Sequence, residues 1–209
     1  MMYIILYILL QYQCVVSSYN LCVVGAGGGL GRELVYQATQ DRKQSVIALT
    51  TSSNIYLPYR GDSYNEKEEM LEYTSPLLDV DNYWTNIDYN YESLIICTGG
   101  SPFEMDYSDT LTKKILENLP DTCDDISIVS AYSVEDETLE KFSIPFQLMS
   151  NIYLKDVYRA KREQERILRL YNASQVRKKV FRPRALSYGF TIIPSTTRKD
   201  LAKEILDTI

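Results

Sequence analysis

The chain has 209 residues, of which 45% are hydrophobic and 24% charged, which is enough to bury one core and barely enough for two. Its formal net charge is −6, with acids gathered at 66–69, 121–125 and 135–140, so nothing in it attracts nucleic acid. No histidine occurs, which excludes Ser–His and Cys–His nucleophilic pairs and histidine-ligated metals. The four cysteines, at positions 14, 22, 97 and 123, lack paired metal-ligand spacing, so we expect free thiols and no zinc.

The first ten residues form an apolar run that is too short to span a bilayer core of roughly 30 Å as a helix. The run has the length of a signal peptide but lacks the basic residues that normally precede one. Residues 1–18 are therefore either a cleaved segment, which implies a secretory or organellar protein, or an uncleaved extension of a cytoplasmic one. We expect no stable membrane span.

A glycine turn at 25–31 follows a short β-branched run and leads into a helix pattern. In its GxxGxxG spacing, Gly25 can form the tight turn, Gly28 can let the main chain approach a pyrophosphate, and Gly31 can let the helix pack on its strand. Phosphates would meet the unpaired N–H groups at the positive end of the helix. The alternative is an ordinary glycine turn. The candidate cofactor-binding residues of the turn are Gly25, Gly28, Gly29, Leu30, Gly31 and Arg32.

The second expected strand, at 45–50, bears on which dinucleotide the turn holds. Enzymes that select NAD place an acid near the end of this strand, yet no Asp or Glu occurs from Arg42 to Gly61. Thr51 and Ser52 offer hydroxyls instead, and Arg32 follows the last glycine, all of which suits a 2′-phosphate. The sequence therefore favours NADP(H) over NAD(H). Alternatively, Arg32 is a solvated first-turn residue and the hydroxyls only close a loop.

Short apolar strands alternate with helix patterns along the rest of the chain. Strands are expected at 92–100, 125–130 and 179–181, and helices at 109–118, 154–171 and 198–208. The less regular stretch 52–91 is expected to hold a short helix and an edge strand. The alternation predicts an α/β fold with a doubly wound parallel sheet, in which ligands bind at the carboxyl ends of the strands.

The order of the motifs resembles that of atypical short-chain dehydrogenase/reductases of the NAD(P)-binding, NmrA-like kind. The matching segments lie at 25–31, 78–80, 97–100, 128–130, 161–165, 180–186 and 193–202. The resemblance implies one NAD(P)-binding Rossmann domain over residues 19–209.

The resemblance also implies cofactor contacts beyond the glycine turn, from Asp79, Val80, Thr98, Gly99, Gly100, Lys161 and Arg182. The aspartate and valine would border the adenine, Thr98 and Gly99 would line the adenosine ribose side, and the lysine would reach the nicotinamide ribose. The segment that begins with Arg182 would lie beside the nicotinamide. Two simpler interpretations compete, because Lys161 and Glu165 have the spacing of an ordinary i,i+4 ion pair and Arg182 can merely end a strand.

The reductases of the wider superfamily pair a tyrosine with a lysine four residues later, so that the ammonium lowers the phenol pKa from its ordinary value of about 10. Here Val157 takes that position, and Tyr158 lies three residues before Lys161, which still places both on one helix face. Ser130, at a strand end, is the candidate partner. The candidate catalytic residues are therefore Lys161, Tyr158 and Ser130, although chance placement competes in a chain with 18 tyrosines.

Two functions of different class remain open. The first, which we prefer, is an NADPH-dependent reductase of a small carbonyl, quinone or flavin-like acceptor, in which the cofactor supplies the hydride. The second is a non-catalytic NAD(P)-binding redox sensor or assembly partner. The altered tyrosine spacing favours the second function, whereas the lysine and the strand-end serine favour the first.

Overall fold

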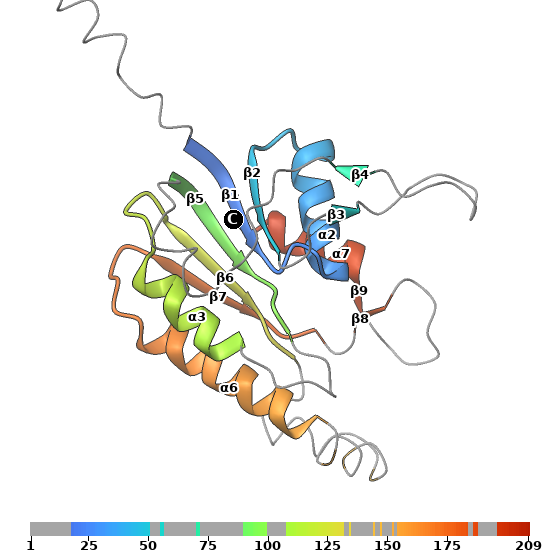
Figure 1. Ribbon diagram of the computed structural model, residues 1–209, viewed down its shortest axis with the longest axis vertical. Coiled ribbons are helices and arrows are strands. Elements are labelled where there is room, and N and C mark those ends of the chain that lie inside the picture. Colours follow the sequence, from blue (N-terminus) through green and yellow to red (C-terminus); the bar gives the residue numbers. More distant parts are fainter. Residues whose placement is uncertain are drawn as a thin grey trace, which may run out of the picture.

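The computed structural model has the predicted alternation of strands and helices (Figure 1). It describes residues 18–50, 55–56, 70–71, 90–99, 108–131, 134, 144, 147, 152, 154–183, 186–187 and 196–209. The strands are β1 (Ser18–Val24), β2 (Val46–Leu49), β3 (Ile55–Tyr56), β4 (Met70–Leu71), β5 (Asn90–Ile96), β6 (Asp125–Val129), β7 (Arg177–Phe181), β8 (Leu186–Ser187) and β9 (Thr196–Thr197). The helices are α2 (Gly29–Tyr36), the π-helix η1 (Gln37–Asp41), α3 (Ser108–Glu117), α6 (Lys155–Leu170) and α7 (Arg198–Leu206).

Five strands form one sheet in the order β2-β1-β5-β6-β7, and every neighbouring pair in it is parallel. From β1 the chain passes first to one side, as β2, and then to the other, as β5. The switch point of this doubly wound sheet therefore lies between β1 and β5, at the end where the glycine turn leaves β1. The predicted fold class is confirmed.

Helices cover both faces of the sheet, with α2 and α7 on one and α3 and α6 on the other (Figure 1). Side chains of β1 alternate accordingly: Leu21 and Val23 join the core beneath α2 and α7, whereas Cys22 and Val24 join the core beneath α3 and α6. A strand that is buried on both faces has no polar side, which explains the unbroken apolar runs in the sequence.

Helix α2 and its continuation η1 show how the apolar pattern is used. Leu30, Leu34 and Ala38 are all buried in the core shared with α7, as their spacing predicts, although the α-helical hydrogen-bond pattern gives way to the π-helix at Gln37. The buried amide of Gln37 donates to the Lys199 carbonyl at 2.9 Å. This bond links the start of η1, directly after α2, to α7.

The described strands outside the main sheet form two small pairs, β3 with β4 and β8 with β9. The edge strand expected in 52–91 is thus represented by an antiparallel pair separate from the main sheet, and the expected short helix lies outside the described residues. Cys22, Cys97 and Cys123 are free thiols, and Cys14 lies outside the described residues. Among the helices described, none combines the length and the apolar character needed to cross a membrane.

Candidate functional site

The glycine turn is packed directly against the end of β5. Gly25 has φ +85°, and the N–H groups of Gly25 and Ala26 both donate to the Leu49 carbonyl at 2.9 Å. A Cβ at Gly25 would lie 3.1 Å from the main chain of Cys97 and Thr98. The positive φ and this close approach both require glycine, so the turn and the end of β5 form one tightly fitted unit.

Gly31 is the most tightly packed of the described glycines. A Cβ there would lie 2.2 Å from the Gly25 carbonyl oxygen and 2.7 Å from Ala26 Cα. At Gly28 the corresponding atom would meet only the Gly25 oxygen, at 3.3 Å. Gly31 therefore sets how closely α2 approaches the turn, whereas Gly28 leaves the main chain open on its outer side.

The N-terminus of α2 opens onto this turn. Gly28 is the N-cap and, lacking a side chain, provides no side-chain cap, and the first bond of the helix runs from Arg32 N–H to the Gly28 carbonyl at 2.9 Å. The N–H groups of Gly29, Leu30 and Gly31 precede that bond and have no partner within the helix. Together with the helix dipole they are suited to contact an anion, and half-buried Arg32 lies in the same first turn.

Lys161 crosses from α6 to the carboxyl ends of two strands. Only 6% of the residue is exposed, and its Nζ donates to the carbonyls of Thr98 and Val129, the latter at 3.0 Å, and to Gln164 Oε1 at 3.1 Å. A Cβ at Gly99 would lie 3.8 Å from Nζ. The ammonium thus sits between the ends of β5 and β6, beside Gly99, and not on the helix surface.

Lys161 also affects the thiol at the end of β5. Burial raises the pKa of Cys97 to about 12, although the nearby ammonium and a backbone hydrogen bond lower it. Its Sγ donates to the Val24 carbonyl at 3.0 Å. The thiol is therefore a packing group between the turn and β5 and not a nucleophile.

Glu165 has a different set of partners from the one its spacing predicts. The carboxylate is 1% exposed and accepts both guanidinium hydrogen bonds of Arg182, at 2.9 and 2.5 Å, with Arg169 adding a contact at 3.1 Å. Burial by itself raises the pKa of Glu165, but hydrogen bonds from Arg182, Ser130 and Arg169, together with the charge of Arg182, outweigh it and hold the pKa below its ordinary value. Arg182, predicted to contact the cofactor, is therefore a partner of Glu165.

Hydroxyl groups lie at the ends of neighbouring strands near these charges. Thr98 Oγ1, after β5, is buried and has no hydrogen-bond partner within the described residues. Ser130, after β6, is also buried and lies beside Glu165, where a hydrogen bond from its side chain helps to lower the pKa of the carboxylate. Tyr158 is 7% exposed and shares the buried face of α6 with Lys161 and Glu165. An unsatisfied buried hydroxyl such as that of Thr98, at the switch point, is suited to a partner from a ligand.

The structure thus brings part of the predicted site together. The glycine turn, Thr98, Gly99 and Lys161 form one cluster at the carboxyl edge, with Ser130 and Tyr158 on the elements that border it. The predicted residues that lie outside the described residues are Thr51, Ser52, Asp79, Val80 and Gly100. Sequence reasoning missed Gln164 and Thr112; the available signal was a polar residue one turn after Lys161 on the buried face of an amphipathic helix.

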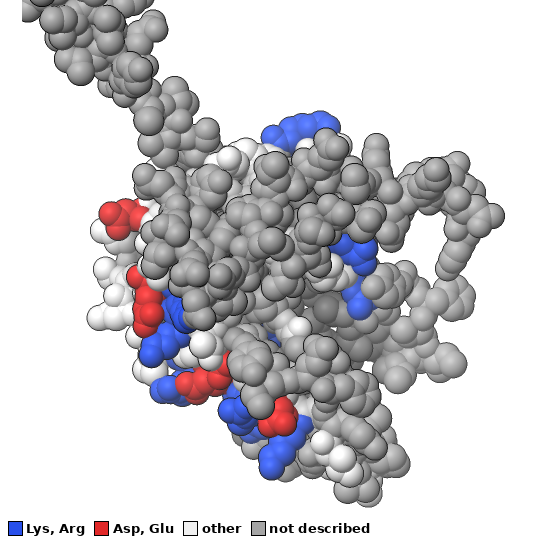
Figure 2. Space-filling model, in the orientation of Figure 1, with Lys and Arg blue, Asp and Glu red and all other residues white. Residues whose placement is uncertain are grey.

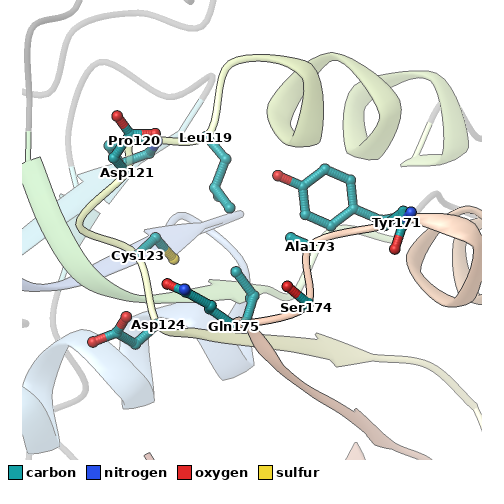
Figure 3. A pocket seen from close by; sticks show the side chains of 11 residues that line it. Leu119, Pro120, Asp121, Cys123, Asp124, Tyr171, Ala173, Ser174 and Gln175 are labelled. Atoms are coloured by element: carbon teal, nitrogen blue, oxygen red, sulfur yellow. The ribbon is translucent and has the colours of Figure 1, made fainter.

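A separate hollow of about 300 Å³ lies at the opposite edge of the sheet. It is lined by residues 119–121, 123–124 and 171–176, from the loops that precede β6 and β7 (Figure 3). Leu119 and the ring of Tyr171 point towards one another across it, whereas the Asp124 carboxylate points away (Figure 3). Because it borders the amino ends of the strands, this hollow is distinct from the glycine-turn site.

Charged side chains of both signs occur together on the described part of the surface. Figure 2 shows positive and negative side chains interspersed over the side formed by α3 and α6. On α6, Arg166 pairs with Glu163 at 2.6 Å and Arg159 lies 3.7 Å from Asp156. The described part of the chain also contains no group of three or more acidic or cysteine side chains placed to hold a metal.

No protein-family model and no curated protein sequence matches this chain. Solved structures do resemble it. A proposed NADH-flavin reductase from Streptococcus pneumoniae aligns with a TM-score of 0.61 at 15% identity, covering 90% of this chain and 91% of that one. The anaerobilin reductase of Escherichia coli aligns at 0.53 and 15% identity, over 90% and 89% of the two chains. A UDP-N-acetylglucosamine 4-epimerase from Bacillus cereus gives 0.58 and 17%, over 90% and 70%.

At these identities the likeness concerns the fold alone. It covers nearly the whole chain, so the chain has a single Rossmann-like α/β domain.

Proposed function

We propose that the chain binds a nicotinamide dinucleotide, preferably NADPH, at the glycine turn and uses it to reduce a small carbonyl, quinone or flavin-like acceptor. The observation that carries the proposal is the joining of three features at the carboxyl edge of the sheet: the glycine-lined N-terminus of α2, the unpartnered buried hydroxyl of Thr98, and the ammonium of Lys161. Two of the similar structures are described as reductases, one of them as an NADH-flavin reductase.

The residues present fit such a cofactor. The N–H groups of α2 would hold the pyrophosphate, Thr98 and Gly99 would border the adenosine ribose, and Lys161 would hold the nicotinamide ribose. Asp79 and Val80 would border the adenine. The preference for NADPH rests on Arg32 in the first turn of α2 and on the acid-free stretch after β2, where Thr51 and Ser52 offer hydroxyls.

When bound, the cofactor supplies the hydride, and the protein has to orient the acceptor and supply a proton. Tyr158 and Ser130 are the candidate proton donors, because both lie on elements that border Lys161. In this proposal Arg182, just after β7, acts indirectly: it pairs with Glu165 on α6 and keeps that carboxylate ionised.

A non-catalytic redox sensor or assembly partner is the second candidate. It is favoured by the Tyr158 spacing and by the protein acceptors to which the Lys161 ammonium already donates, on Thr98, Val129 and Gln164. Fluorescence titration of the full chain with NADPH and NADH, followed by acceptors while the absorbance of the reduced nicotinamide is recorded, separates the two. Oxidation identifies a reductase, binding alone identifies a sensor or partner, and no binding rejects both.

Gly28→Asp is expected to weaken NADPH affinity by about 100-fold without harming the fold, because a carboxylate would face the proposed pyrophosphate. Gly28 occupies the N-cap with φ −73° and ψ 161°, a conformation that aspartate adopts readily and in which it caps a helix well. The unfolding free energy should therefore stay level or rise. Gly28→Asn, of equal size but uncharged, is the matched control. Equal affinities for the two variants would contradict the assignment of a phosphate site.

Lys161→Met is expected to lower NADPH affinity at least about tenfold, since it removes the ammonium beside Gly99. It also leaves the buried carbonyls of Thr98 and Val129 without this donor, so the unfolding free energy should fall by roughly 1–3 kcal/mol. Isothermal calorimetry and urea unfolding measure the two effects. Lys155→Met, at an exposed position of the same helix, should change neither. A loss of stability with unchanged affinity would assign the lysine a structural role only.

A further inference from the structure

Lys161 belongs to a buried chain of hydrogen bonds that links α6 to α3. Its Nζ donates to Gln164 Oε1 at 3.1 Å, Gln164 Nε2 donates to Thr112 Oγ1 at 2.8 Å, and Thr112 Oγ1 donates to the Ser108 carbonyl at 2.7 Å. Gln164 and Thr112 are both 0% exposed. This series of hydrogen bonds therefore runs through the interface of the two helices without contact with water.

Which groups donate and which accept along this series of hydrogen bonds is fixed at its Ser108 end. The Thr112 hydroxyl has one proton, which goes to the Ser108 carbonyl, so towards Gln164 it can only accept. The donor end of the Gln164 amide must then face Thr112, which leaves its oxygen facing the ammonium. Thr112 thus sets the orientation of Gln164, and Gln164 presents an acceptor to Lys161.

An amide is an expensive residue at this position. The surrounding core consists of apolar side chains, among them Ile115, Leu116 and Leu168, and a buried amide is costly unless both of its ends are paired. Among the acceptors that Nζ contacts, those of Thr98 and Val129 are main-chain carbonyls at the strand ends, whereas that of Gln164 is a side chain. A helix–helix contact alone does not require it, because an apolar side chain would pack there without that cost.

We propose that Gln164 is a positioning residue: it holds the Lys161 ammonium at the ends of β5 and β6, beside Gly99, with Thr112 fixing its orientation. The inference rests on the proposed function, because it assigns Gln164 a role in binding the dinucleotide through Lys161. Without this acceptor the lysine side chain loses a restraint and samples other rotamers, so the charge spends less time where the cofactor needs it.

The first test is a double-mutant cycle on NADPH affinity. Gln164→Met, similar in size but without an acceptor, is expected to weaken binding about tenfold, Thr112→Val by a smaller factor, and Gln164→Glu, which retains an acceptor, by less than about threefold. In a Lys161→Met background, Gln164→Met should cause no further loss. Gln175→Met, at an exposed loop position, is the matched control. Losses that simply multiply in the double variant would overturn the proposal.

The second test needs no cofactor. Reductive methylation of the full chain, followed by peptide mass spectrometry, reports how accessible each lysine is, and exposed Lys155 on the same helix serves as the internal reference. Gln164→Met should label Lys161 several-fold faster relative to Lys155, with helix content by circular dichroism unchanged; unaltered protection would overturn the proposal. If the wild type fails to bind NADPH but the variant unmasks Lys161, the proposed function fails while the positioning of the lysine stands.

Discussion

Replacing Gly31 with alanine is expected to lower the unfolding free energy by about 3 kcal/mol or more and to abolish dinucleotide binding. The added Cβ would lie 2.2 Å from the Gly25 carbonyl oxygen and 2.7 Å from Ala26 Cα. Both are main-chain atoms, so no side-chain rotation relieves the overlap, and α2 has to move away from the turn. That movement displaces the N–H groups of the proposed phosphate site. Urea unfolding and NADPH titration measure the two losses.

Gly28→Ala is the control for this effect, because its Cβ would meet a single atom, the Gly25 oxygen, at 3.3 Å. We expect it to change the unfolding free energy by less than about 1 kcal/mol. If Gly31→Ala unfolded at the same urea concentration as the wild type, the close packing of α2 on the turn would be wrong. If it remained folded and bound NADPH normally, the helix terminus would not be the phosphate site.

The fold could be predicted from the sequence because its signals are local. An unbroken apolar run such as 46–49 is sufficient to indicate a strand buried on both faces, and Leu30, Leu34 and Ala38 are sufficient to indicate the buried side of a helix. The spacing of Gly25 and Gly31 can likewise be recognised locally, because the chain turns sharply after β1 at Gly25 and α2 packs closely on that turn at Gly31. Each of these signals can be recognised from residues that are close in the sequence, although the side chains pack against distant elements in the fold.

The arrangement around Lys161 could not be predicted in the same way, because its partners are distant in the sequence. The spacing of Lys161 and Glu165 favours an ion pair within α6. In the folded chain, Lys161 donates to the carbonyls at the ends of β5 and β6, and Arg182, after β7, donates to Glu165. Groups at three strand ends therefore compete with the local Lys161–Glu165 ion pair. Gln164 becomes identifiable as a partner only once α3 is packed against α6.

The same contacts predict how stability depends on pH. The pKa of Glu165 lies below its ordinary value in the folded chain, so its ionised form is bound more tightly there than in the unfolded chain. Its contribution is fully present above the pKa of an unfolded glutamate, about 4.3, and is lost as the pH falls through the lower folded value. The carboxylate is thus one source of acid unfolding.

Glu165→Gln is therefore expected to lower the unfolding free energy at neutral pH by about 3 kcal/mol, because Arg182 loses its buried counter-charge. Below about pH 4.5 the wild type should lose stability more steeply than the variant, so the two curves converge as the pH falls. Glu163→Gln, which removes an exposed pair with Arg166, should cost less than about 1 kcal/mol and leave the steep region intact. Urea unfolding across this range provides the comparison. Parallel curves for the wild type and Glu165→Gln would mean that the arginines do not bind the ionised carboxylate preferentially, and Arg182 would then be available to act on the acceptor directly.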